Sequence, residues 1–223
     1  MTDCRIRLYQ ESDYGMVREV YAQCVKDLTP DGFYQALRFS HIRLFMLAIF
    51  LLSLLTTGSF LVSVLGIILV MVVLWMCSRE FFHSYVHVTF SNDMFDIGKY
   101  YLQREGYGFW VAECGGKVVG TVAAAPLTHV GGKKHVELRR MAVIKSHRGR
   151  GIAKALCKTI IDFARKKGFQ AVILETSIAQ VGGQRVYESM GFRITHIFDY
   201  PKMTAKVMGN KFLGYQYDIL EAE

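Results

Sequence analysis

Residues 148–153 (RGRGIA) combine residue types and a position that suit phosphate binding. They directly follow a predicted strand and open a predicted helix. A glycine-rich turn at such a junction lets backbone N–H groups point into one concavity, and the positive end of the helix dipole adds to them. Side chains at Gly149 and Gly151 would block a pyrophosphate. The segment therefore predicts a diphosphate-bearing ligand that is bound mainly by main chain.

Other phosphate-binding loops fit this segment poorly. It lacks the Gly-Lys-Ser/Thr of ATP-binding loops, and no G-x-G-x-x-G stands ahead of an acidic residue about 20 positions on, as dinucleotide binding requires. From these six residues alone, a plain tight turn that binds no ligand is the alternative to a phosphate-binding loop.

The surrounding pattern predicts a mixed α/β domain, because alternating and apolar runs separate amphipathic stretches. A strand at 5–10 precedes a helix that ends near 25. The later elements are a helix at about 94–104, strands at 109–114, 117–126 and 135–144, a helix at about 151–167, a buried strand at 171–177, and a short helix ended by Gly191 before a strand-like tail.

Three motifs resemble those of one family. Arg148, Gly151 and Ala153 match R/Q-x-x-G-x-G/A, the acetyl-CoA pyrophosphate loop of GNAT acetyltransferases. The strand ELRRMAV before the loop resembles the GNAT strand that binds the thioester, and VYESMGF resembles the late helix that carries a tyrosine. Together with an apolar insertion near the N-terminus, HRGRGIAKAL and YESMGF are similar to the camello-type, N-acetyltransferase 8-like family of membrane acetyltransferases.

This resemblance implies a GNAT acyl-CoA N-acyltransferase fold and acetyl-CoA as co-substrate. The implied cofactor-binding residues lie on the thioester strand and on the loop. They are Met141, Ala142, Val143, Arg148, Gly149, Arg150, Gly151, Ile152 and Ala153.

The mechanism that the resemblance implies is direct transfer to an amine. An N–H near Met141 would meet the oxyanion, and Tyr187 would protonate the leaving CoA thiolate. Glu137 and Glu175 are both candidates for the base that deprotonates the ammonium group. A chain of water molecules, or a low pKa of the acceptor amine, is the alternative to either.

Neither a metal site nor a disulfide is expected. His129, His135 and His147 lack the spacing of metal ligands. The five cysteines are odd in number and scattered, which predicts reduced thiols.

An uninterrupted apolar block runs from Leu44 to Ser78. A bilayer core about 30 Å thick needs roughly 20 helical residues per crossing, so the block exceeds one span and falls short of two ideal ones. If strand 5–10 pairs with strands after residue 109, both flanks lie on the same side of the membrane. We therefore predict a transmembrane or re-entrant helical hairpin over residues 42–78 that turns near 56–59. It separates residues 1–40 from residues 80–223, which together form the catalytic domain.

The net charge of +8 suits an anionic partner. CoA phosphates and membrane lipid are the expected partners, and nucleic acid is not, because no nucleic-acid motif accompanies the charge. Lys26, Arg38, Arg43 and Arg79 flank the apolar block and favour a cytosolic catalytic domain. A luminal orientation is the alternative, because the family is also associated with luminal lysine acetylation. The family resemblance implies endoplasmic reticulum or Golgi membranes.

Three functions follow, in order of preference. The first is N-acetylation of the α-amino group of a small molecule such as a cysteine S-conjugate. The alternatives are acetylation of protein lysines in the secretory pathway and a catalytically inactive membrane scaffold. The intact loop and Tyr187 argue against the scaffold.

Overall fold

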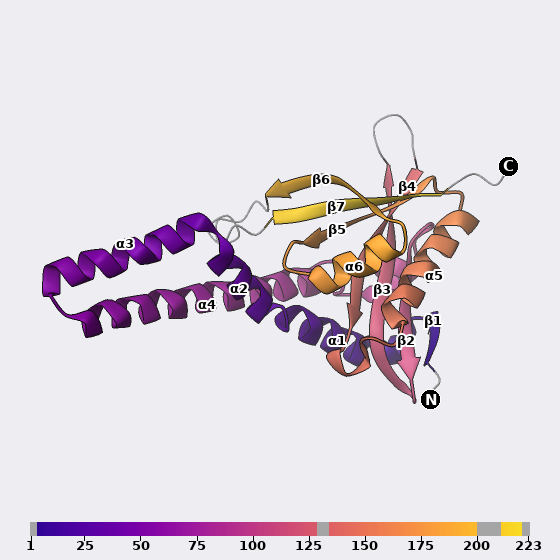
Figure 1. The fold of residues 1–223 in the computed structure, drawn as a ribbon. Helices are drawn as coiled ribbons and strands as arrows, with labels where there is room; N and C mark the ends of the chain where they lie inside the picture. Colours follow the sequence, from indigo (N-terminus) through magenta and orange to yellow (C-terminus); the bar gives the residue numbers. More distant parts are fainter. Residues whose placement is uncertain (1–3, 129–133, 200–210, 220–223) are drawn as a thin grey trace.

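A single mixed sheet forms the body of the molecule in the computed structural model, which describes residues 4–128, 134–199 and 211–219 (Figure 1). The seven strands lie in the order β1-β2-β3-β4-β5-β7-β6. They are β1 (Cys4–Leu8), β2 (Gly108–Cys114), β3 (Lys117–Thr128), β4 (Lys134–Val143), β5 (Ala171–Ser177), β6 (Arg193–Asp199) and β7 (Lys211–Asp218). Neighbouring strands are antiparallel except β4 and β5. The predicted mixed α/β fold is confirmed.

Helices cover both faces of this sheet (Figure 1). They are α1 (Tyr14–Lys26), α2 (Thr29–Arg38), α3 (Ser40–Thr57), α4 (Phe60–Ser91), α5 (Ile152–Lys166) and α6 (Val181–Ser189), with short turns η1 (Glu11–Asp13), η2 (Gly98–Leu102) and η3 (Lys145–His147). Successive side chains of a strand point to opposite faces. Phe109 and Val111 accordingly pack with α1 and α4, whereas Trp110 and Ala112 pack with α5.

Two segments differ from the sequence-based expectation. Residues 94–104 form turns and the short π-helical η2 in place of a regular helix. In this segment the Tyr101 side chain is fully buried and its hydroxyl donates to the Asp93 carboxylate. Residues 29–38, for which the sequence pattern predicted no helix, form α2.

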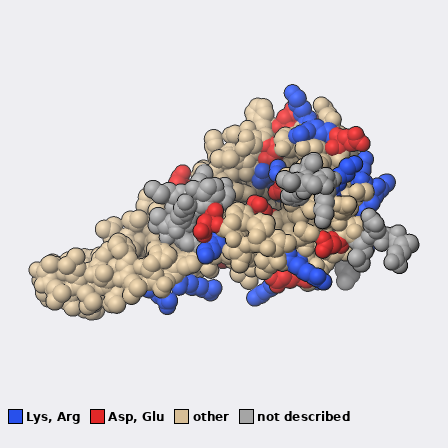
Figure 2. Space-filling view, turned by 90° about the horizontal axis from the view of Figure 1, so that it is seen from above, with Lys and Arg blue, Asp and Glu red and all other residues tan. Residues whose placement is uncertain are grey.

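α3 and α4 form a helical hairpin that projects from the body as a long arm (Figure 1). It turns at Gly58, whose φ of 64° favours glycine. Both helices are long and apolar enough to span a membrane. In the most apolar 18-residue stretch of each helix, only 6% of α3 and 11% of α4 is buried within the protein. Figure 2 shows almost no charge over the outer part of the arm. α4 then continues without a break into the body as far as Ser91.

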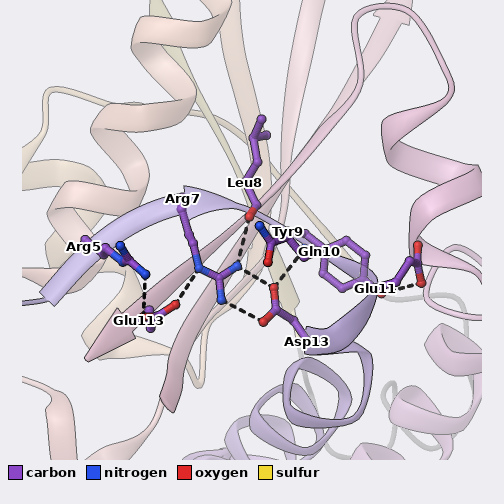
Figure 3. A network of polar contacts seen from close by, with 8 residues as sticks. All are labelled: Arg5, Arg7, Leu8, Tyr9, Gln10, Glu11, Asp13 and Glu113. Carbon is purple, nitrogen blue, oxygen red and sulfur yellow. Dashed lines mark hydrogen bonds and ion pairs between the residues drawn. The ribbon is translucent and has the colours of Figure 1, made fainter. Parts of the chain in front are cut away.

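Ion pairs attach the strand that precedes the arm to a strand that follows it (Figure 3). Arg7 on β1 contacts Asp13 through Nη1 at 2.6 Å and Nη2 at 2.8 Å, and its Nε donates to Glu113 on β2 at 2.6 Å. The hydrogen bond from Arg7 lowers the pKa of Asp13. The Asp13 carboxylate also accepts from the N–H of Gln10 and so orders the start of the helical segment. Both flanks of the arm are therefore fixed in one sheet.

The expectation that all cysteines are reduced is wrong for one pair. Cys4 and Cys114 face each other on β1 and β2 and form a disulfide. They are 110 positions apart in the chain, so only strand pairing reveals their proximity. Cys24, Cys77 and Cys157 are free thiols.

Candidate active site

The candidate site lies where β4 and β5 separate. These parallel strands pair only from His135 to Glu137 on β4. Farther along, β4 contains an extra residue relative to β3, because Thr121 and Ala123 face Ala142 and Arg139. A bulge of this kind bends a strand and interrupts its ladder. The separation leaves room for ligands between the strands.

A cavity of about 670 Å³ opens on this separation. Every predicted cofactor-binding residue except Arg150 lines it. Those residues are Met141, Ala142, Val143, Arg148, Gly149, Gly151, Ile152 and Ala153. The opposite wall comes from α6 and the loop before it, with Ala179, Gly182 and Gly183.

The glycine loop is shaped to receive an anion. Gly149 and Gly151 have φ values of 75° and 80°, which favour glycine, and a Cβ at either position would project into open space. Gly151 is the N-cap of α5, and no side chain caps that helix, so its first N–H groups remain available. These features fit the pyrophosphate of acetyl-CoA. Arg148 instead holds the loop to β4, because its Nε donates to the Val143 carbonyl at 2.9 Å.

A second cavity of about 320 Å³ adjoins the first. Glu137, Arg139 and Glu175 contribute its charged wall. Its aromatic wall is formed by Tyr21, Phe81, Phe82, Tyr85 and Phe212. Both cavities are lined by Met141, Gln180 and Tyr187, so these residues mark the junction at which two substrates would meet.

Tyr187 on α6 has the surroundings expected of a neutral proton donor. Its side chain is 7% exposed and packs against the rings of Phe192 and Tyr215. Burial raises the pKa of Tyr187, so the hydroxyl keeps its proton at neutral pH. Among the described residues this hydroxyl has no hydrogen-bond partner, which leaves it available to a ligand.

The two carboxylates differ in their surroundings. Glu137 accepts a hydrogen bond from Arg139 Nε at 2.6 Å and forms an ion pair with the same guanidinium group. Glu175 has no such partner among the residues that the structure describes; its side chain is exposed, yet partial desolvation raises its pKa, and the charge of Glu137 adds to this effect. A carboxylate with a raised pKa accepts a proton more readily, so Glu175 is better suited to general-base chemistry than Glu137.

The sequence-based interpretation missed a buried ion pair beside the junction. Arg140 occupies the β4 bulge with a φ of 53°, which is rare for a residue other than glycine. Its Nε and Nη2 donate to Asp93 at 2.7 and 2.6 Å, and its Nη1 donates to Thr89 of α4 at 3.3 Å and to Tyr21 of α1 at 3.2 Å. The bulge is thus fixed to helices on one face of the sheet. The position of Arg140 within a predicted strand could have indicated a charged residue that needs a partner. No nearby sequence pattern indicated that Asp93 is this partner.

No metal-binding group is found in the described part of the chain. Residues 4–128, 134–199 and 211–219 contain no cluster of three or more His, Cys, Asp or Glu side chains that would hold an ion. His129 lies outside the described residues. His147 lines the larger cavity, near the glycine loop.

Comparison with known proteins identifies the family of the chain. The model of the acetyltransferase (GNAT) family matches residues 73–192. The chain is 38% identical over 223 residues to N-acetyltransferase 8B of Rattus norvegicus, covering 100% of both chains. It is 40% identical over 196 residues to N-acetyltransferase 8 of Mus musculus, covering 87% of this chain and 86% of the relative.

Solved structures show the same fold at low sequence identity. A GNAT-family acetyltransferase from Staphylococcus aureus Mu50 has a TM-score of 0.56 at 18% identity, covering 97% of this chain and 99% of its own. The Salmonella typhimurium acetyltransferase yncA, solved with its cofactor acetyl-CoA, has a TM-score of 0.55 at 16% identity, covering 100% and 97%.

The fold, the loop and the family match define a GNAT N-acetyltransferase that uses acetyl-CoA. Within this class, the chain belongs to the N-acetyltransferase 8 family.

Gly151→Glu is expected to abolish acetyl-CoA binding in calorimetry, because a carboxylate in the loop repels the pyrophosphate. Gly168→Glu is the matched control, since Gly168 also has a positive φ, of 71°, and open space around its Cβ position, but lies beyond the other end of α5. The control should keep wild-type affinity. Wild-type acetyl-CoA affinity in both variants would show that the loop does not bind the pyrophosphate.

Proposed function

We propose that this protein is a membrane-bound enzyme that acetylates the α-amino group of a small amphipathic molecule such as a cysteine S-conjugate. The observation that carries the proposal is the junction of the two cavities at Tyr187 and Met141. Acetyl-CoA occupies the larger cavity, and the acceptor amine enters from the smaller one.

Transfer takes place at the junction. The neutral amine attacks the thioester carbonyl, a C–N bond forms, and the C–S bond breaks. Glu175 takes the proton of the ammonium group before attack, backbone N–H groups near Met141 stabilise the oxyanion, and Tyr187 gives its proton to the departing thiolate. The nitrogen loses a further proton as the amide forms, and this proton restores Tyr187 through solvent. Glu137 accepts a hydrogen bond from Arg139 and orients that arginine.

The acceptor class follows from the walls of the smaller cavity. Phe81, Phe82 and Tyr85 all come from α4, within two turns of its apolar segment, and they form an aromatic surface. Arg139 and Glu175 provide charge on the other side. A molecule with a charged head and an apolar tail suits both walls, and such a molecule also partitions into membranes.

Release of CoA in purified membranes, measured against a panel of acceptors, tests this function. For cysteine S-conjugates, kcat/KM should rise with the length of the S-substituent, by up to about fourfold per methylene that becomes buried. Lysine peptides should react more slowly. A preference for lysine peptides would establish the protein-lysine alternative, and no CoA release with any amine would favour the inactive scaffold.

Tyr187→Phe keeps the packing of the ring and removes its proton donor. Turnover should fall by about 10²-fold, the lower range for general acid catalysis, while acetyl-CoA affinity changes little.

Glu137→Gln and Glu175→Gln are the comparison variants. A base acts only when unprotonated, so wild-type kcat/KM should rise with pH through the raised pKa of Glu175, and Glu175→Gln should lose this rise. Turnover of Tyr187→Phe within about twofold of wild type would make Tyr187 a packing residue.

The arm is proposed to cross an endoplasmic reticulum or Golgi membrane as a hairpin. Tags at residues 1 and 223 should therefore be equally accessible to protease from one face of intact microsomes, because β1 and β2 pair across the insertion. Protection of a single tag would exclude the hairpin.

The same experiment assigns the face. The basic flanks of the apolar block favour the cytosol, as predicted from the sequence, whereas the Cys4–Cys114 disulfide favours an oxidising lumen. Cleavage of both tags from outside would place the domain in the cytosol. Protection of both would place it in the lumen.

A further inference from the structure

A groove of about 520 Å³ lies where the arm joins the body, separate from the two cavities described above. Three segments form it: the α1–α2 connection, one face of α4 and the turn η3. Its lining residues are Lys26, Asp27, Thr29, Pro30, Trp75, Arg79, His83 and Lys145. Figure 2 shows Lys and Arg side chains, together with some Asp and Glu side chains, between the almost uncharged outer part of the arm and the body.

Two of the three Lys and Arg side chains that line the groove lack an ion-pair partner among the described residues. Lys26 and Arg79 are exposed and form no ion pair within the described part of the chain. Asp27 is the one acidic residue in the lining; its Oδ1 lies 3.7 Å from Lys145 Nζ. One carboxylate therefore faces three Lys and Arg side chains, and the groove carries excess positive charge that an anion would neutralise.

α4 places this charge at the depth of lipid headgroups. Trp75, Arg79 and His83 follow at intervals of four residues and so share one face of the helix. About 18 residues of helix span about 27 Å. If Phe60 lies near one face of the bilayer, Arg79 therefore lies near the other. Trp75 stands one turn closer to the apolar core, which is the position that tryptophan favours at interfaces.

We propose that the groove binds the anionic headgroup of a membrane phospholipid, with Arg79 and Lys26 facing the phosphate and Trp75 at the boundary of the acyl chains. The proposal rests on the membrane insertion proposed above. A free phosphate ester has the same chemistry, but the depth of Arg79 favours a lipid. Lys145 lies between Val143 and Arg148, so the lipid would be bound next to the segment that lines the acetyl-CoA cavity.

Tryptophan fluorescence of the full chain in nanodiscs tests the proposal. The chain has two tryptophans, and Trp110 is buried in the core of the body, so quenching by brominated lipid reports on Trp75. Brominated phosphatidylserine should be enriched at Trp75 about fivefold over brominated phosphatidylcholine at equal mole fraction, the factor expected for one cation near charged lipid. Lys26→Gln combined with Arg79→Gln should remove this preference.

Arg43→Gln is the matched control, because Arg43 is also exposed at the start of the arm but does not line the groove. It should retain the preference; an equal loss in both variants would overturn the proposal in favour of general surface attraction. Equal quenching by the two lipids in the wild type would also overturn it, while leaving membrane insertion intact. Absence of quenching by either lipid would refute insertion and the lipid site together. Soluble glycerophosphoserine should compete only weakly, and full competition by it would identify a free phosphate ester as the ligand.

Discussion

The buried ion pair between Arg140 and Asp93 is the contact on which the geometry of the site depends. A non-glycine residue at positive φ costs about 1–3 kcal/mol and persists only where its surroundings hold it there. Here they do so, because Asp93 is 4% exposed and binds both the Arg140 guanidinium group and the Tyr101 hydroxyl. Loss of one partner of such a pair costs about 3–5 kcal/mol, since a charge is left buried and unpaired. The bulge that this pair holds interrupts the ladder of β4 and lies where β4 and β5 separate beside the larger cavity.

One helix connects the proposed membrane segment to this ion pair. α4 is about 48 Å long at 1.5 Å per residue, and it serves different purposes along its length. Its first part belongs to the apolar arm, Trp75 and Arg79 border the basic groove, and Phe81 and Tyr85 wall the acceptor cavity. Near its end Thr89 contacts Arg140. Because the helix is unbroken, it fixes the position of the smaller cavity relative to the arm, which suits the proposed acceptor that partitions into membranes.

The chemistry of the site depends on how differently its polar groups are surrounded. Tyr187 is enclosed by rings and keeps its proton, whereas Glu137 forms an ion pair with Arg139. Partial desolvation raises the pKa of Glu175, and the charge of Glu137 raises it further. A neutral hydroxyl, a paired carboxylate and a carboxylate with a raised pKa thus line the smaller cavity. Glu137 and Glu175 are chemically identical side chains, so only their surroundings distinguish them.

The sequence by itself determined the features that depend on neighbouring residues. Alternation and apolar runs located most strands, the glycines located the loop before α5, and the uncharged block from Leu44 to Ser78 located the arm. The family resemblance named Tyr187 and the loop as parts of one site, and in the structure they line one cavity. Only the tertiary structure decided the Cys4–Cys114 disulfide, the Arg140–Asp93 pair and the contrast between Glu137 and Glu175. These contacts join residues 110, 47 and 38 positions apart, and the physical reason is that strand order and helix packing, which no local pattern encodes, bring such residues together.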